Sequence, residues 1–321
     1  MRILIAVDGS PSSAFARDLV ASIAWPAASH LRVVSALEIG GALFGAPWYA
    51  VAPANADELE SRYLRESERL VSDWTTGLAR PDRQTSSAVI RGRAATSVIE
   101  EARRFGADLV VVGSRGHGGL ETMLLGSVSA EIVDHASCPV LVARRDRVRS
   151  LLMADDGSAG ARAAAEKLVR WSAFTGLPVT VLSVVGVTVP WEPPYATKYD
   201  PGDGDYLNQS REANLEAHRR IAEDTAARLR TAGCEATAEV RTGHAANEIV
   251  MAARDLDVDL VVVGTRGHTG LARLLLGSVA RNVLTHVLCS VLVVRERAAA
   301  RQASASADAP PAVEEPVGFR G

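Results

Sequence analysis

Val110–Val128 of this chain reads VVVGSRGHGGLETMLLGSV, and Val261–Val279 reads VVVGTRGHTGLARLLLGSV. Each segment starts with a run of β-branched residues that predicts a buried parallel strand. In both segments three glycines and a serine follow at one spacing, Gly-x2-Gly-x9-Gly-Ser. A glycine turn after a strand lets backbone N–H groups approach a ligand closely, and the start of the next helix offers N–H donors to an anion. The chain is therefore predicted to bind the phosphates of a nucleotide twice.

The repeat extends beyond the glycines. Asp108–Arg144 and Asp259–Arg295 share 22 of 37 aligned residues, which indicates an internal duplication. ILIAVDGS at Ile3–Ser10 likewise matches LLMADDGS at Leu151–Ser158. We expect one domain at 1–145, a second at 148–296, and a tail at 298–321 whose Ala/Ser/Pro/Glu composition predicts disorder.

Within each half, apolar strands alternate with helical patterns, which is typical of βαβ units and a parallel sheet. Ser10 followed by Pro11 predicts a helix N-cap with proline at the first helical position. The predicted strands are 2–7, 31–37, 85–90, 108–113 and 139–143, then 149–155, 178–185, 235–241, 259–264 and 290–294. The predicted helices are 11–24, 56–79, 95–105 and 127–136, then 159–175, 206–232, 245–256 and 278–287.

The composition excludes several classes of protein. A net charge of −3 over 321 residues gives no electrostatic footprint for nucleic acid. The first apolar run, MRILIAV, is too short for a signal peptide or a membrane span, so we expect a cytoplasmic protein that does not bind membranes. Three cysteines without a CxxC pair are expected to be reduced, buried thiols.

The paired glycine motifs and the Asp-Gly-Ser near the start of each half resemble the universal stress protein family, in its tandem two-domain form and its ATP-binding branch. The resemblance covers about residues 1–296. It implies an α/β fold of two open, parallel five-stranded sheets in the order 3-2-1-4-5, with helices on both faces, like the adenine nucleotide alpha hydrolases. It also implies that strand 5 pairs across a two-fold axis, so we expect an internal pseudo-dimer or a homo-oligomer such as a homodimer.

The resemblance also implies one ATP site per half, with Mg²⁺, where strands 1 and 4 end side by side. Four kinds of residue are assigned to it, each with a simpler alternative. Aspartates would meet the adenosine end or only make Asx turns; small strand residues would line the adenine pocket or only fill the core. Loop arginines would pair with phosphate or only face solvent, and the glycines would cradle phosphate or serve only turns and packing. The residues are Asp8, Ala36, Gly113, Arg115, Gly116, Gly126, Ser127, Val128 and Ser129 in the first half, and Asp156, Val184, Gly264, Arg266, Gly267, Gly277, Ser278, Val279 and Ala280 in the second.

Two differences set the second copy apart. Ala280 replaces the hydroxyl of Ser129, which predicts a slightly weaker grip on the phosphates. Asp155 replaces Val7, and two adjacent carboxylates would repel a triphosphate unless a metal or an arginine intervened. Ser127 and Ser278 are also good N-cap residues.

Neither a P-loop nor a dinucleotide fingerprint is present in the sequence, and no catalytic constellation repeats between the halves. A phosphate cradle without a positioned base is expected to bind ATP far better than it cleaves it. We therefore expect a cytoplasmic stress-response regulator or sensor that acts through a protein partner. The alternatives are a slow ATPase or nucleotidyl-transfer enzyme on the same sites, and an interaction module with vestigial sites.

Overall fold

The computed structural model describes residues 1–38, 56–116, 125–186, 201–265 and 276–295. The tail expected at 298–321 lies outside these ranges. The first half contains β1 (Arg2–Ala6), α1 (Pro11–Ser22), β2 (His30–Leu37), α3 (Ala56–Leu78), β3 (Gln84–Arg91), α4 (Ala94–Phe105), β4 (Leu109–Gly113), α5 (Ser127–His135) and β5 (Val140–Ala143). The second half contains β6 (Leu151–Ala154), α6 (Ala159–Trp171), β7 (Pro178–Gly186), α7 (Pro201–Thr231), β8 (Glu235–Gly243), α8 (Ala245–Asp255), β9 (Leu260–Gly264), α9 (Ser278–His286) and β10 (Ser290–Val294).

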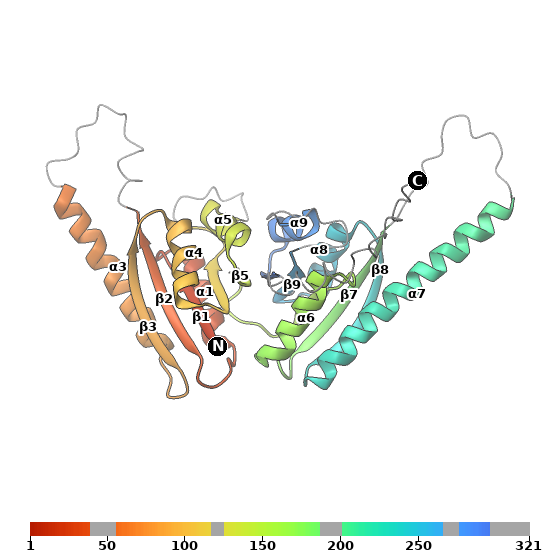
Figure 1. Ribbon diagram of the computed structural model, residues 1–321, viewed down its shortest axis with the longest axis horizontal. Coiled ribbons are helices and arrows are strands. Elements are labelled where there is room, and N and C mark those ends of the chain that lie inside the picture. Colours follow the sequence, from red (N-terminus) through yellow and green to blue (C-terminus); the bar gives the residue numbers. More distant parts are fainter. Residues whose placement is uncertain (39–55, 117–124, 187–200, 266–275, 296–321) are drawn as a thin grey trace, which may run out of the picture.

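The strands of the two halves form a single ten-stranded sheet in the order β3-β2-β1-β4-β5-β10-β9-β6-β7-β8. Each half thus has the expected strand order 3-2-1-4-5. All strand pairs within a half are parallel, as expected. The halves join through β5 and β10, which pair antiparallel with Leu141 opposite Leu292. Strand 5 of each half is thus paired inside the chain, as an internal pseudo-dimer requires, and the two halves lie side by side (Figure 1). Assembly of several chains stays a prediction.

Alternation along the strands divides the interior into two cores, one on each face of the sheet. On β4, Leu109 and Val111 face a core that includes residues of α1, α3, α6 and α7. Val110 and Val112 face the other core, which is closed by α4, α5, α8 and α9. Both cores contain residues from both halves, so the join between the halves is part of the hydrophobic interior.

The helix ends follow local sequence. Ser10 caps α1, its hydroxyl accepting from the Ser13 amide at 3.2 Å, with Pro11 at the first helical position as predicted. The helix expected at 159–175 was predicted too long, because Ser172 takes a left-handed backbone with φ of 49° and ends α6 at Trp171. No helix in the described part of the chain is long and apolar enough to cross a bilayer.

Candidate nucleotide site

The candidate site of each half lies at the carboxyl edge of the sheet. In the first half β1 and β4 are parallel neighbours with Ala6 opposite Val112, so the residues after both strands emerge together. The chain turns from β1 toward β2 on one side and reaches β4 on the other, which makes this the position where the winding direction reverses. In the second half β6 and β9 are neighbours in the same way. Ligands of open parallel sheets bind at this position.

Gly113 lets the start of α1 approach β4 closely. A Cβ placed on Gly113 would lie 2.6 Å from the carbonyl carbon of Ser12 and 2.8 Å from the amide nitrogen of Ser13. Gly264 makes the same contact in the second half, 2.6 Å from the carbonyl carbon of Gly160. These two glycines are therefore required for packing, whether or not they also face a ligand.

Asp8 and the glycine loop converge after β1 and β4. The Asp8 carboxylate accepts from the Ser10 amide at 2.9 Å, which is an Asx turn, and a Cβ on Gly116 would lie 2.8 Å from its other oxygen. The Ser10 hydroxyl also donates to the Arg115 carbonyl at 3.3 Å. The Asx turn and the contact with the glycine loop occur together, so a turn in the first loop does not exclude Asp8 from the site.

The glycine loop closes on itself before α5. The amide of Gly126 donates to the Ser114 carbonyl at 2.7 Å, which brings the end of the motif back beside its start. A Cβ on Gly126 would lie 3.3 Å from the Arg115 Cα, a tight contact but not an overlap. The structure thus brings Asp8, Gly113, Gly116 and Gly126 together.

The N-terminus of α5 has no side-chain cap. The N-cap residue is Gly126, with φ of −77° and ψ of 155°, and Ser127 occupies the first helical position, so the prediction of Ser127 as N-cap was wrong. The same correction applies to Ser278, because Gly277 is the N-cap of α9. Since glycine offers no acceptor, the amides of the first helical turn keep their partial positive charge for an anion.

The residues after Ser127 place different side chains at this end of α5. Val128 is exposed, and the buried Ser129 hydroxyl donates to the Gly113 carbonyl at 2.7 Å. Ser129 therefore ties the first turn of α5 to the end of β4. Val279 is exposed in the same way, whereas the buried Ala280 has no hydroxyl to make this tie.

The second half repeats the loop closure, with the Gly277 amide donating to the Thr265 carbonyl at 2.7 Å. The Asp156 carboxylate accepts from the Ser158 amide at 3.0 Å, as Asp8 does from Ser10. The carboxylate of Asp155 is only 4% exposed and accepts from the Gly157 amide at 2.8 Å. The repulsion expected from two adjacent carboxylates is thus reduced, because one of them is turned into the loop. Arg266 and Gly267 lie outside the described residues.

The predicted adenine positions lie on the second strand of each half. Ala36 is the penultimate residue of β2, opposite Ile90 of β3, and Val184 lies near the end of β7, opposite Arg241 of β8. Both side chains are half-buried. They reach the same edge of the sheet as the glycine loops, one strand beyond β1 and β6 respectively.

The comparisons with known proteins agree with this architecture. A model of the Universal stress protein family matches residues 1–144 and again 147–295. The universal stress protein YxiE of Bacillus subtilis is 30% identical over 147 residues, which are 44% of this chain and 98% of that protein. A universal stress protein of Mycolicibacterium smegmatis is 26% identical over 260 residues, covering 78% of this chain and 82% of its own length.

Among solved structures, a universal stress protein of Archaeoglobus fulgidus is similar over 92% of this chain and 98% of its own length. Its TM-score is 0.59 and its sequence identity is 16%, so this likeness concerns the fold. The family model covers nearly all the described residues, and it matches twice, once over each half of the joined sheet. The chain belongs to the Universal stress protein family, with two copies of the family fold in one polypeptide.

Proposed function

We propose that this protein binds ATP, one molecule per half, at the carboxyl edge of the sheet. The observation that carries the proposal is the uncapped N-terminus of α5 and α9, each held behind a glycine turn that closes on itself. Backbone amides in this arrangement complement the charge of a phosphate chain without a lysine. The exact repetition of the arrangement after 151 residues supports two equivalent sites.

In this proposal the site residues divide the nucleotide between them. Asp8 and Asp156 hold the adenosine end through a ribose hydroxyl, while Ala36 and Val184 line the adenine pocket. Arg115 and its counterpart in the second loop pair with phosphate oxygens. The amides of the first helical turns bind the phosphates, in the first half from Gly126, Ser127, Val128 and Ser129, and in the second from Gly277, Ser278, Val279 and Ala280.

The chain's own residues favour a metal held mainly by the nucleotide. Among the residues that the structure describes, no group of three acidic, histidine or cysteine side chains is placed to hold a metal ion. In the first half the Asp8 carboxylate lies against Gly116 of the glycine loop. Mg²⁺ usually keeps several waters and binds one or two carboxylates together with phosphates. We therefore propose that Mg²⁺ enters with ATP and meets the protein at most through Asp8 or Asp156.

Binding rather than turnover is the proposed activity. The nucleotide would order the glycine loops, and the ordered form would be recognised by a protein partner in a stress response, which is a shift between populations of conformers. The assay for the competing enzymatic function is ATP hydrolysis. Multiple turnovers that disappear in the double variant Ser127→Glu, Ser278→Glu would overturn the proposal in favour of an enzyme.

Ser127→Glu and Ser278→Glu test the sites one at a time. A carboxylate in the first turn stabilises a helix by about 0.3–1 kcal/mol but repels phosphate from the same amides. Each variant should keep its melting temperature and lose one of two ATP equivalents in calorimetric titration, and the double variant should lose both. Ser72→Glu adds the same charge on the exposed face of α3 and should leave both sites intact. An unchanged titration in the double variant, or no binding to the wild-type protein, would refute the proposed sites.

A further inference from the structure

The two halves exchange an arginine across their join. Arg144 follows the last residue of β5, and its guanidinium reaches α9 of the other half. It donates to the carbonyl oxygen of Leu284 at 2.6 Å and to that of Cys289, just beyond the helix, at 3.3 Å. A guanidinium at this end of a helix meets the negative end of the helix dipole.

Arg295 makes the reciprocal contact. It stands 151 residues after Arg144, directly after β10, and donates to the carbonyl oxygens of Val133, at 2.6 Å, and Asp134, near the end of α5. The two arginines are therefore equivalent in the duplication. Each half holds the C-terminus of the helix whose N-terminus forms the candidate phosphate site of the other half.

Both arginines are half-buried, which makes their placement specific. Burial lowers the pKa of Arg144 to about 10 and also lowers the pKa of Arg295. A charge withdrawn from water is costly unless its donors meet acceptors. Carbonyls at the C-terminal end of the facing helix accept from the terminal nitrogens of both guanidinium groups, so the position of each arginine depends on the position of that helix.

A continuous series of contacts leads from Arg295 to the second site. The carbonyl of Val294, immediately before Arg295, accepts from the Thr265 amide at 3.0 Å. The Thr265 carbonyl in turn accepts from the amide of Gly277, the N-cap of α9, at 2.7 Å. Displacement of α5 is thus transmitted through one side chain and two backbone hydrogen bonds to the start of α9.

The opposite direction has an electrostatic component. Ala143, just before Arg144, lies opposite Gly113, the first glycine of the first loop. The guanidinium of Arg115 in that loop adds to the lowering of the Arg144 pKa, because the two positive charges repel each other. A phosphate that neutralised Arg115 would remove this repulsion and favour the contact of Arg144 with α9.

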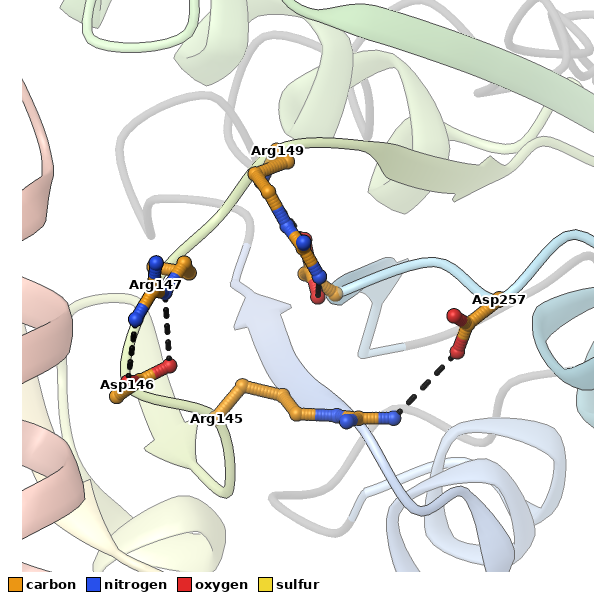
Figure 2. A network of polar contacts seen from close by, with 6 residues as sticks. Arg145, Asp146, Arg147, Arg149 and Asp257 are labelled. Carbon is orange, nitrogen blue, oxygen red and sulfur yellow. Dashed lines mark hydrogen bonds and ion pairs between the residues drawn. The ribbon is translucent and has the colours of Figure 1, made fainter.

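Besides the two arginines, the ion pair of Arg281 with Asp134 at 2.9 Å joins α9 to α5, whereas the contacts of the linker, the segment between β5 and β6, do not connect these two helices. Arg145 pairs with Asp257 at 3.6 Å, and Arg149 pairs with Asp259 at 3.1 Å, which fastens the linker to the second half (Figure 2). Figure 2 also shows the pair of Arg147 and Asp146 within the linker. The nitrogen and oxygen of this pair are 3.0 Å apart. Arg145 therefore offers a matched control, since it is an arginine next to Arg144 that reaches the surface of the second half rather than α9.

We propose that Arg144 and Arg295 are positioning residues that couple the two nucleotide sites, so that ATP bound in one half raises the affinity of the other half. The inference rests on the proposed function. Coupling between sites typically changes affinity by about 5–150-fold. Its sign is positive, because each bound phosphate chain stabilises the helix that the other half already holds.

Calorimetric titration with ATP of the full chain tests the coupling. The wild-type protein should bind two equivalents of ATP cooperatively. In Ser278→Glu, the site that remains in the first half should bind ATP with an affinity at least about fivefold lower than that of the second binding step of the wild type. Arg295→Met and Arg144→Met keep an unbranched apolar stem and remove the donors. Each should retain two equivalents but bind them independently, whereas Arg145→Met should keep the cooperativity.

Each outcome of this titration has a defined meaning. Two independent equivalents in the wild type, a single equivalent, or cooperativity that survives Arg295→Met and Arg144→Met would overturn the coupling while leaving nucleotide binding in place. Absence of ATP binding to the wild type would instead refute the proposed function itself. If Arg295→Met lowers the melting temperature, Arg295→Lys provides the second test, because it keeps the buried charge but cannot reach two carbonyls with a planar fork.

Discussion

Replacing Gly113 by alanine should destabilise the fold, because the space for a Cβ is already occupied by backbone. The added carbon would lie 2.6 Å and 2.7 Å from the carbonyl carbon and oxygen of Ser12, and 2.8 Å from the amide nitrogen of Ser13. These atoms form the first turn of α1 and cannot rotate away, so β4 and α1 must separate. Overpacking of a closed interior costs about 1–3 kcal/mol, and we expect a loss of this size in the free energy of unfolding.

Urea denaturation followed by circular dichroism measures this effect, with Gly77→Ala as the matched control. A Cβ on Gly77 of α3 meets no atom within 4 Å, so there the same change should stabilise the protein by up to about 1 kcal/mol. Gly264→Ala should behave like Gly113→Ala, since its Cβ would lie 2.6 Å from the Gly160 carbonyl carbon. The packing argument fails if Gly113→Ala unfolds at the same urea concentration as the wild type or a higher one.

Three further results are expected. Ser290→Ala should lower the free energy of unfolding by about 2 kcal/mol or more, measured in urea, because its buried hydroxyl accepts from two linker amides at 3.1 Å; an unchanged midpoint would contradict this. Burial raises the pKa of Cys138 and of Cys289 to about 11, so a disulfide reagent at pH 8 should label them only after unfolding, and fast native labelling would disprove it. Burial and two neighbouring arginines lower the pKa of His30. The unfolded chain then binds the proton more readily, so stability should fall as pH drops through about 6.5, and His30→Asn should reduce that fall in denaturation measured at pH 7.5 and 5.5.

Most of the fold follows from periodicity in the sequence. Runs such as Leu109–Val112 predict buried parallel strands, and the intervening helical patterns are long enough to cross from one strand to the next. The largest errors fall at helix ends, where the pattern of apolar residues carries little information. The helical pattern continues through Phe174, which is buried in the core, but the left-handed Ser172 ends α6 at Trp171.

The geometry of the candidate site was predictable where the backbone determines the residue type. Gly113 stands where α1 approaches β4 closely, and Gly126 stands at the start of α5, which has no side-chain cap. The spacing between these two glycines identifies the loop. The hydrogen-bond partners were not predictable. Nothing in the sequence signals that the Ser129 hydroxyl donates to the Gly113 carbonyl, or that Arg144 crosses to the other half. Such contacts depend on the antiparallel join of β5 and β10, whose register a pattern within one half cannot specify.

Ser290 of the second half stands where the first half has Pro139, and this difference shows how a duplicated chain accommodates the linker between its halves. The two halves are related by the antiparallel pairing of β5 and β10, but only β5 continues into a segment that must turn and enter the other half. At that turn the Ser290 hydroxyl accepts from the amides of Arg144 and Arg145, both at 3.1 Å, and the Ser290 amide donates to the Asp259 carbonyl at 3.1 Å. A proline has neither the hydroxyl nor the amide proton. The serine is therefore needed in only one copy, beside the linker, and the departure from symmetry has a structural cause at the join rather than a cause at either candidate site.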